Sequence, residues 1–589
     1  MSKKESGKAF DAKIFMRILS FAKSYKTHFI IATFAVVATA FLSAYRPYLL
    51  KEAVADFTTN KNEATLLDYT LLMLAVLIAE VVLQVLFIYF ANWIGQHIIR
   101  DMRAKIFRKI LQFKMSYFDT TSVGRLVTRV VSDIETIASS FSQGLFMIIS
   151  DILKMLVVIV VMLLMNWQLA LIALAVLPIL IYATKLFQIA IKSTFQEVRT
   201  QVANLNGFVQ ERVTGMKIVQ LFSREKIEYE KFMDINDKHK KAHVKAVWYY
   251  SIFFPVAEVL SSIAIGLLVW YGGLQSVNNV NVAPGEIMSF IMMTQMLFRP
   301  LRQIADKFNT LQMGIVSGER VFGVMDTDSS IDKIGTIVAK DLQGKIEFKD
   351  VRFSYIKDEE VLKGISFQVE KGQTVAIVGA TGAGKSTIIN LINRFYEIDS
   401  GTICVDEVSV KDYEINSLRN QIAIVLQDVF LFSDSILNNI TLKDENITFE
   451  EVEEAAKQIG IHDFIMTLPN GYHYNVKERG AMLSSGQRQL IAFLRAYVSK
   501  PSVLILDEAT SSVDSHAEQM IQFATDTITK GRTSIVIAHR LATIKKADKI
   551  IVMDKGLIVE QGTHKQLLKK NEGYYKNLYE KQFSSVELT

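Results

Sequence analysis

The stretch Thr374-Val-Ala-Ile-Val-Gly-Ala-Thr-Gly-Ala-Gly-Lys-Ser386 joins a short apolar run to a glycine-rich loop. Its second part, 379–386, fits the pattern G-x-x-x-x-G-K-[ST], in which backbone N–H groups surround phosphate oxygens. In this pattern Lys385 reaches the β- and γ-phosphates, and Ser386 can hold Mg²⁺. A strand before the loop and a helix after it are the context in which the pattern binds a nucleotide, so the stretch predicts an α/β domain.

Three further apolar runs lead into polar residues: Gln427 after 422–426, Asp507 and Glu508 after 503–506, and His539 at the end of 534–539. Because the carboxyl ends of parallel strands meet at one edge of a doubly wound sheet, these polar groups are expected to converge on one phosphate. Asp507 is placed to hold Mg²⁺ through water, and Glu508 to polarise an attacking water.

The segment Leu483-Ser-Ser-Gly-Gln-Arg-Gln489 lies between the glycine loop and Asp507. It is predicted to open a helix, and its helix N-terminus and small residues form a second anion site. One chain need not bring both anion sites to the same phosphate. Together the two sites suggest two nucleotide domains that close on shared ATP.

In this order the motifs resemble those of the ABC transporter family, and the resemblance covers essentially the whole chain. It implies that Tyr355 stacks on adenine. It also implies a phosphate-binding loop made of Gly379, Ala380, Thr381, Gly382, Ala383, Gly384, Lys385, Ser386 and Thr387. The remaining implied roles are metal binding by Ser386, Gln427 and Asp507, catalysis by Gln427, Glu508 and His539, a D-loop contact by Asp514, and a signature motif of Ser484, Ser485, Gly486 and Gln487.

One position departs from the pattern of the family. Ser485 stands where the signature usually has its first glycine, whereas Ser484 and Gly486 are retained. The change bears on the rate of hydrolysis more than on the role of the motif. Residues 476–480 lie where exporters of this family carry their X-loop. Alone, a histidine at a strand end is usually a polar cap and a lone tyrosine usually a packing residue; the shared order favours the functional interpretation.

Composition divides the chain into two parts. Half of the 589 residues are hydrophobic and 21% are charged, and the two kinds are segregated: long apolar runs precede about residue 315, and short alternating strands and helices follow about residue 340. A single cysteine, Cys404, excludes an internal disulfide framework and a metal site of several cysteines.

A helix needs about 20 apolar residues to cross a bilayer core. Six segments meet this length, at 27–50, 66–93, 141–165, 168–189, 247–273 and 284–312. No cleavable signal peptide is evident before the first of them. Lysines and arginines cluster before span one, between spans two and three, and between spans four and five, whereas the opposite loops, 166–167 and 274–283, carry no charge. The positive-inside rule therefore places both termini and the ATPase domain in the cytoplasm.

The expected fold is that of a two-domain membrane protein. An all-α transmembrane domain of six helices with long cytoplasmic extensions occupies 1–325, a linker 326–343, and an α/β P-loop ATPase domain of ABC type 344–589. The two cytoplasmic connections are interrupted near 117–124 and 211–216, which resemble the coupling helices of exporters. A simple helical hairpin turn is the alternative.

Charged residues within or near the apolar stretches are the local clue to the substrate: Glu80, Asp151, Lys154, Glu258, Arg299 and Arg302. Such residues normally face a cavity or a partner. Asp151 and Lys154 are spaced to neutralise each other on one helix. Pairing between helices and contact with the substrate both remain open.

The sequence therefore predicts one half of a dimeric exporter in the cytoplasmic membrane, with ATP and Mg²⁺ as cofactors. The expected cargo is an amphipathic molecule, a lipid or a hydrophobic drug, and the expected partners are a second half-transporter and membrane lipids, with no nucleic acid. Alternatives are one half of a heterodimer, a peptide exporter, an ATP-regulated receptor or channel, and a soluble ATPase acting on DNA or ribosomes. The apolar spans argue against the last.

Overall fold

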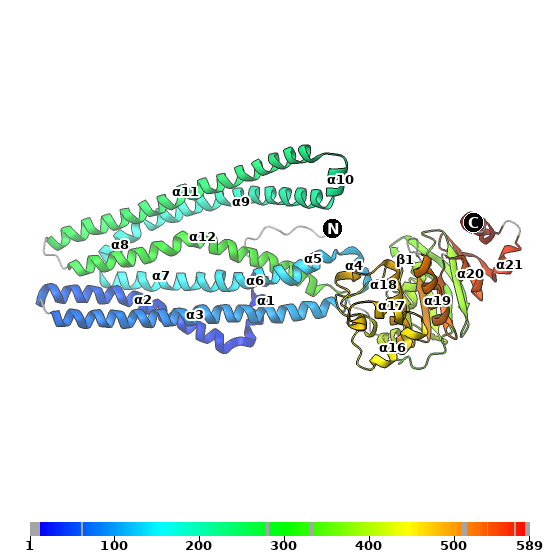
Figure 1. Ribbon diagram of the computed structural model, residues 1–589. Coiled ribbons are helices and arrows are strands. Elements are labelled where there is room, and N and C mark those ends of the chain that lie inside the picture. Colours follow the sequence, from blue (N-terminus) through cyan, green and yellow to red (C-terminus); the bar gives the residue numbers. More distant parts are fainter. Residues whose placement is uncertain are drawn as a thin grey trace. The chain divides into compact units, whose positions relative to one another are not determined.

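The computed structural model describes residues 12–60, 63–277, 282–329, 335–507, 515–538, 540–570 and 573–583. The chain divides into two compact units (Figure 1). One comprises Met1–Leu111 and Ser122–Asp328 and is helical, and the other comprises Gln112–Thr121 and Ser329–Thr589 and contains the strands of the described residues. The predicted layout of a helical membrane region followed by an α/β region is confirmed.

The helical unit is built from long helices: α2 (Lys26–Asn60), α3 (Glu63–Ile110), α7 (Met147–Met165), α8 (Trp167–Ala175), α9 (Leu177–Thr214), α11 (Glu225–Val277) and α12 (Pro284–Asp326). Five described stretches are long and apolar enough to cross a membrane: Lys13–Thr58, Ala64–Ile110, Val123–Met165, Trp167–Thr214 and Glu225–Val277. Helix α12 covers the sixth predicted span but is not among these five, and its sequence carries Glu286, Gln295 and Arg299 among its apolar residues.

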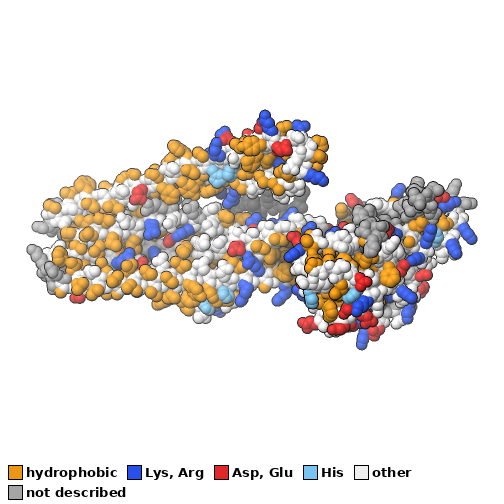
Figure 2. Space-filling model, viewed as in Figure 1, with side chains coloured by type: hydrophobic (Ala, Val, Ile, Leu, Met, Phe, Trp, Pro, Cys, Tyr) orange, Lys and Arg blue, Asp and Glu red, His pale blue; other side chains and the backbone are white. Residues whose placement is uncertain are grey.

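The surface of this unit suits a lipid environment. Figure 2 shows hydrophobic side chains over most of its visible face, while charged side chains are denser over the second unit. On α3, Ile78, Val82 and Val85 are each at least half exposed, which places large apolar side chains outside the bundle. Water would penalise this arrangement, whereas hydrocarbon favours it. The protein is therefore a multi-pass membrane protein.

Helix ends in this unit follow local sequence. Asn166 lies between α7 and α8, and its side chain accepts hydrogen bonds from the backbone N–H groups of Gln168 and Leu169, at 3.1 and 3.2 Å. An asparagine at this position caps a helix by satisfying donors of its first turn. The predicted short connection at 166–167 is thereby confirmed. Pro178, in the first turn of α9, coincides with the break between α8 and α9.

Near one end of the bundle a buried carboxylate joins two helical stretches. Asp133 is 4% exposed and lies in the π-helical turn Arg129–Asp133. It accepts hydrogen bonds or ion pairs from Arg129 at 2.7 Å, from Arg320 of α12 at 2.8 Å and from Ser317 of α12 at 3.2 Å. Two guanidinium groups around one buried carboxylate satisfy its charge and hold α12 against the 123–146 stretch.

The two stretches also approach closely at a glycine. A Cβ atom built on Gly314 of α12 would lie 2.1 Å from the Cβ atom of Ser140, so only glycine is accommodated there. The Ser140 hydroxyl donates to the backbone carbonyl of Leu311 at 3.2 Å. Ser140 begins a second π-helical turn, Ser140–Phe146. The contact between α12 and this stretch is thus made by backbone proximity as well as by the charges around Asp133.

Two of the predicted membrane charges are paired between helices. Glu80 of α3 lies 3.6 Å from Arg46 of α2. Asp151 of α7 is paired with Lys307 of α12, rather than with Lys154 as its sequence spacing suggested, and both partners are about one-fifth exposed. Facing helices allow a lysine from another element to reach Asp151 across the bundle. Pairing within the bundle therefore accounts for these two acids.

The pairing predicts a specific pattern of stability. Asp151→Asn should leave Lys307 charged in a low-dielectric bundle, a loss of roughly 3–5 kcal/mol for a buried pair. The double variant Asp151→Asn/Lys307→Met removes both charges and should recover much of this loss. Thermal unfolding of the purified protein in detergent measures both. Equal melting temperatures for wild type and Asp151→Asn would show that the pair contributes nothing to stability.

The second unit contains a six-stranded sheet in the order β10 (Leu557–Gly562), β9 (Lys549–Asp554), β3 (Thr374–Gly379), β8 (Thr533–Ile537), β7 (Val503–Asp507) and β6 (Ile422–Val425). All neighbours are parallel except β10 with β9. A smaller antiparallel sheet has the order β2 (Glu359–Val369), β1 (Ile346–Ile356), β4 (Ser400–Val405) and β5 (Val408–Ser409).

The central strands of the larger sheet, β3, β7, β8 and β9, are buried on both faces. Alternate residues of β3 enter different cores: Val375 and Ile377 pack with the smaller sheet, and Ala376 and Val378 pack with helices that include α18 (Ser485–Val498). Strands covered on both faces are hydrophobic throughout, as these sequences are. Because neither face is open, polar groups on the strands reach a ligand at the carboxyl edge of the sheet.

Candidate nucleotide site

The glycine loop connects β3 to α13 (Lys385–Ile392), as its sequence predicts. Gly384 is the N-cap residue of α13, with a φ of 97°, and a Cβ atom there would lie 2.8 Å from Leu362. Gly382 has a φ of 81°. Glycine alone adopts these left-handed conformations without strain, so both residues allow the backbone to curl over the first turn of α13. This is the arrangement that presents N–H groups to phosphate.

Lys385 lies inside this loop. Its ammonium group donates to the backbone carbonyls of Gly379 and Ala380, at 2.9 and 3.0 Å, and the residue is 7% exposed. Burial lowers the pKa of Lys385, and the nearby Asp507 carboxylate offsets part of that effect. The interaction places Asp507 beside the loop. An ammonium group that donates to backbone carbonyl oxygens can turn toward a phosphate when one arrives.

The other strand-end residues occupy the same edge. Asp507 is the last residue of β7, which lies between β8 and β6, and Gln427 follows β6 by two residues and is exposed. Strand β8 leads to His539. The topology therefore brings the ends of β3, β6, β7 and β8 to one edge. Glu508, Asp514 and His539 themselves lie outside the described residues.

The signature residues form the start of α18. The backbone N–H of Gln487 donates to the Ser484 hydroxyl at 3.2 Å, and the backbone N–H of Ser484 donates to the Gln487 side-chain oxygen at 2.9 Å. This reciprocal capping box satisfies two donors of the first turn. Ser484 and Ser485 are exposed and Gly486 is buried. The N-terminus of α18 is thus capped, with the two serines Ser484 and Ser485 at the surface.

The predicted X-loop is tied to this helix end. Arg488 of α18 donates to the carbonyl of Leu483 at 2.8 Å and to that of Gly480 at 3.4 Å. Lys477 and Arg479 both have positive φ angles, 59° and 52°, which few residues with a side chain adopt. Backbone strain of this kind is retained where surrounding contacts impose it. Because Arg488 binds the carbonyl of Gly480, a movement of residues 476–480 would also move the start of α18.

Tyr355 lies beside the first turns of α13. Its hydroxyl is 3.4 Å from the Thr387 hydroxyl and accepts a hydrogen bond from Asn390 at 3.1 Å. The residue is 45% exposed, which leaves ring surface for stacking. Asn390 was not predicted from sequence, although its place one turn after Thr387 could have suggested a role in orienting groups beside the loop.

Comparison with known proteins agrees with this geometry. A family described as "ABC transporter transmembrane region" matches residues 29–301, and one described as "ABC transporter" matches residues 362–511. The "ATP-dependent lipid A-core flippase" of Syntrophus aciditrophicus is 34% identical, with 97% of this chain and 94% of the relative covered. This chain belongs to the ABC transporter family. It has one membrane region and one ATPase region, as an exporter-type half-transporter does.

Two other relatives of this ABC transporter are from Bacillus subtilis, and each is 35% identical. "Putative multidrug export ATP-binding/permease protein YgaD" matches over 96% of this chain and 99% of its own length. "Uncharacterized ABC transporter ATP-binding protein YknV" matches over 98% of this chain and 96% of its own length. The ATPase region binds a nucleotide, and the ABC transporter couples ATP hydrolysis to transport.

One group of contacts in the ABC transporter was not predicted. The short helix α4 (Met115–Thr120) belongs to the ATPase unit, in which the Tyr396 hydroxyl donates to the Asp119 carboxylate. The backbone N–H of Lys114 donates to the carbonyl of Ser329 at 2.7 Å. Nothing in the local pattern around Tyr396 distinguishes it from an ordinary surface aromatic, because its partner lies far away in the sequence.

Proposed function

We propose that this ABC transporter uses ATP to export or flip an amphipathic molecule, a lipid or a hydrophobic drug-like compound, across the cytoplasmic membrane. The observation that carries the proposal is likeness over nearly the full length to proteins named as a lipid A-core flippase and a multidrug export protein. The apolar surface of the helical unit supports a membrane-embedded path. A peptide exporter and an ATP-regulated channel are the alternatives that transport measurements separate from it.

The working form is a dimer, with residues 1–325 as transmembrane domain, 326–343 as linker and 344–589 as ATPase domain. Six spans, including α12, place both termini and the ATPase in the cytoplasm, as the basic loops indicate. The short helices α4 and α10 (Met216–Leu221) act as the two coupling segments, predicted at 117–124 and 211–216. Helix α9 continues through 211–214 and ends before Gly215, so the second short helix follows the predicted break.

ATP lies between two chains in this mechanism. Tyr355 stacks on the adenine, while Lys385 and the N–H groups of 379–387 bind the β- and γ-phosphates. Ser484 and Gly486 of the second chain complete the site through the N-terminus of its α18, and Asp514 contributes to the contact between chains. The exposure of Ser484 and Ser485 supports this sharing.

Hydrolysis then depends on residues at the carboxyl edge of the sheet. Glu508 accepts a proton from the attacking water, Gln427 helps to place that water, and His539 donates to the γ-phosphate. Closure on ATP opens the membrane path outward, and hydrolysis allows the two ATPase domains to separate. In this scheme α4 and α10 transmit the movement to the helices.

The site also suits a magnesium ion. Ser386 and Asp507 offer a hydroxyl and a carboxylate close to Lys385, and the exposed Gln427 amide offers another oxygen. Hard oxygen ligands of this kind bind Mg²⁺, which usually keeps several waters and is shared with substrate phosphates. When bound, the ion neutralises charge on the β- and γ-phosphates. The described residues contain no group of three or more acidic, histidine or cysteine side chains that could hold an ion by themselves.

Both Glu508 and His539 are present in the sequence, which favours a homodimer over a heterodimer with one degenerate site. Reconstitution in liposomes tests the proposed function directly. Labelled lipids and hydrophobic dyes should cross the membrane only with ATP, and they should stimulate ATP hydrolysis by the purified homodimer. Flux that persists with an ATP analogue resistant to hydrolysis would contradict active export and support a channel.

Ser485→Gly restores the glycine common in the family and should support transport with equal or higher ATP hydrolysis. Ser485 is exposed at the first position of α18, so removing its side chain opens space beside the shared phosphate while Ser484 keeps its cap. ATP hydrolysis and dye flux in the same liposomes measure the effect. Ser499→Gly, at the other end of α18, controls for a general effect of glycine on this helix. Loss of activity in folded Ser485→Gly would assign Ser485 a positive role.

A further inference from the structure

Three aromatic rings join the proposed adenine site to Tyr396. The Tyr355 ring meets the Tyr396 ring edge to face, with centroids 5.0 Å apart and an interplanar angle of 87°. Phe353 contacts both, at 4.7 Å from Tyr355 and 5.8 Å from Tyr396. Edge-to-face pairs of this kind have a preferred geometry, so a ring that stacks on Tyr355 restricts the orientation of its neighbours.

The far end of this chain of contacts is helix α4. The Tyr396 hydroxyl donates to the Asp119 carboxylate, and burial, followed by that hydrogen bond, raises the pKa of the Tyr396 phenol. Phe113 is 4% exposed and packs against Tyr117 of α4 at a centroid distance of 4.4 Å. A hydrogen bond to a carboxylate is stronger than one between neutral groups. Asp119 is therefore the polar link between Tyr396 and α4.

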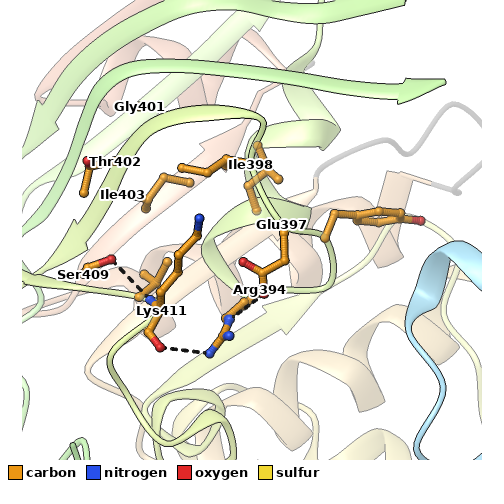
Figure 3. A pocket seen from close by; sticks show the side chains of 11 residues that line it. Arg394, Glu397, Ile398, Gly401, Thr402, Ile403, Ser409 and Lys411 are labelled. Carbon is orange, nitrogen blue, oxygen red and sulfur yellow. Dashed lines mark hydrogen bonds and ion pairs between the residues drawn. The ribbon is translucent and has the colours of Figure 1, made fainter. Parts of the chain in front are cut away.

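Contacts made by the neighbouring residues Arg394 and Glu397 restrain the backbone around Tyr396. Tyr396 lines a cavity of about 110 Å³ together with Arg394, Glu397 and Lys411. Figure 3 shows the ion pair between Arg394 and Glu397, with 2.8 Å between Arg394 Nε and Glu397 Oε1, and the Arg394 hydrogen bond to the Lys411 carbonyl at 3.3 Å. Arg394 is 5% exposed. The residues on either side of Tyr396 are thus held, while its hydroxyl reaches α4.

We propose that Tyr396 is a positioning residue that transmits adenine binding at Tyr355 to helix α4 through its hydrogen bond to Asp119. The inference rests on the proposed role of Tyr355 in binding adenine. In this proposal the adenine base of ATP, as well as its triphosphate, contributes to the movement of α4. A ligand that fills the phosphate loop without an adenine should then bind but displace this helix much less.

A fluorescent label on α4 tests this in the full-length dimer. Ser116 is exposed on α4, and the native thiol of Cys404 is buried with a raised pKa, so an environment-sensitive dye would react with Ser116→Cys. In this background, a hydrolysis-resistant ATP analogue should shift the fluorescence. Saturating ribose 5′-triphosphate, which lacks the base, should give a much smaller shift.

Tyr396→Phe keeps the ring and loses the hydroxyl. It should bind the ATP analogue to saturation, yet give the small shift seen with ribose 5′-triphosphate. Tyr413→Phe is the matched control, since the Tyr413 hydroxyl donates to the backbone carbonyl of Val405 at 3.1 Å, and it should keep the full shift. A full shift in Tyr396→Phe, or an equal shift by ribose 5′-triphosphate in the parent protein, would overturn the proposal.

Substitution of Asp119 provides a second, independent test in the same assay. Asp119→Ala should reproduce the effect of Tyr396→Phe, and the double variant should lose no more than either single one, because both changes break the same bond. Additive losses would overturn the proposal. This readout needs nucleotide binding but no cargo. A normal fluorescence pattern without flux in liposomes would reject export alone, whereas flux with a full shift in Tyr396→Phe would reject the relay alone.

Discussion

Glu508→Gln should bind ATP normally, hydrolyse it about 10²–10⁴-fold more slowly and accumulate as a closed dimer. Glu508 directly follows Asp507, the last residue of β7, so we expect it to bring a second carboxylate to the edge where the glycine loop lies. Glutamine keeps the size of the side chain and removes its ability to accept a proton from water. Phosphate release, nucleotide binding and cross-linking between chains measure the three effects.

Glu445→Gln serves as the control, because Glu445 is exposed between α15 (Ile436–Thr441) and α16 (Phe449–Gln458). It should retain wild-type turnover. If purified Glu508→Gln kept near wild-type turnover, Glu508 would not be the general base, and a different group at this edge would have to activate the water.

Lys385→Met should lower kcat/KM for ATP by about 10²–10³-fold, the usual loss when one preorganised donor to a developing negative charge is removed. Methionine fills a similar volume without an ammonium group, so the fold of the loop should persist. Lys371→Met, at an exposed lysine before β3, should leave kcat/KM unchanged.

The lowered pKa of Lys385 adds a dependence on pH. An ammonium with a lowered pKa is charged at neutral pH and loses its proton at a less alkaline pH than an exposed lysine does. The affinity of the wild type for ATP should consequently fall as the pH rises through that pKa, and Lys385→Met should lack this alkaline decline. Equal pH profiles in the two proteins would show that the charge of Lys385 does not act on ATP.

The parts of the fold that sequence predicts are those encoded locally. The 374–386 stretch contains its strand, its left-handed glycines and its helix start within a few residues, and the structure has them in that order. Asn166 likewise signals the helix start that it caps. Apolar length predicts six membrane spans, and five described stretches of the structure are long and apolar enough to match them; α12 covers the sixth predicted span but is not among those five.

Features made by distant residues could not be predicted in the same way. Asp151 was expected to face Lys154, three residues away, but its partner is Lys307, from another helix. Tyr396 and Asp119 are 277 residues apart, and neither belongs to a motif from which the other could be predicted as its partner. A hydrogen bond between such residues depends on the packing of whole elements, which a single sequence does not encode in any short pattern.

The capping box at the start of α18 has a consequence for how firmly two chains can hold ATP. Ser484 and Gln487 are already hydrogen-bonded to each other's backbone N–H groups, so a phosphate arriving from a second chain would replace existing bonds as well as add new ones. An exchange of hydrogen bonds changes the free energy by much less than the full strength of one bond, because a typical net contribution is about 0.5–1.5 kcal/mol. A helix start whose backbone N–H groups are already hydrogen-bonded within its own chain favours reversible association with a second chain. Such an end can release its partner once in every catalytic turnover.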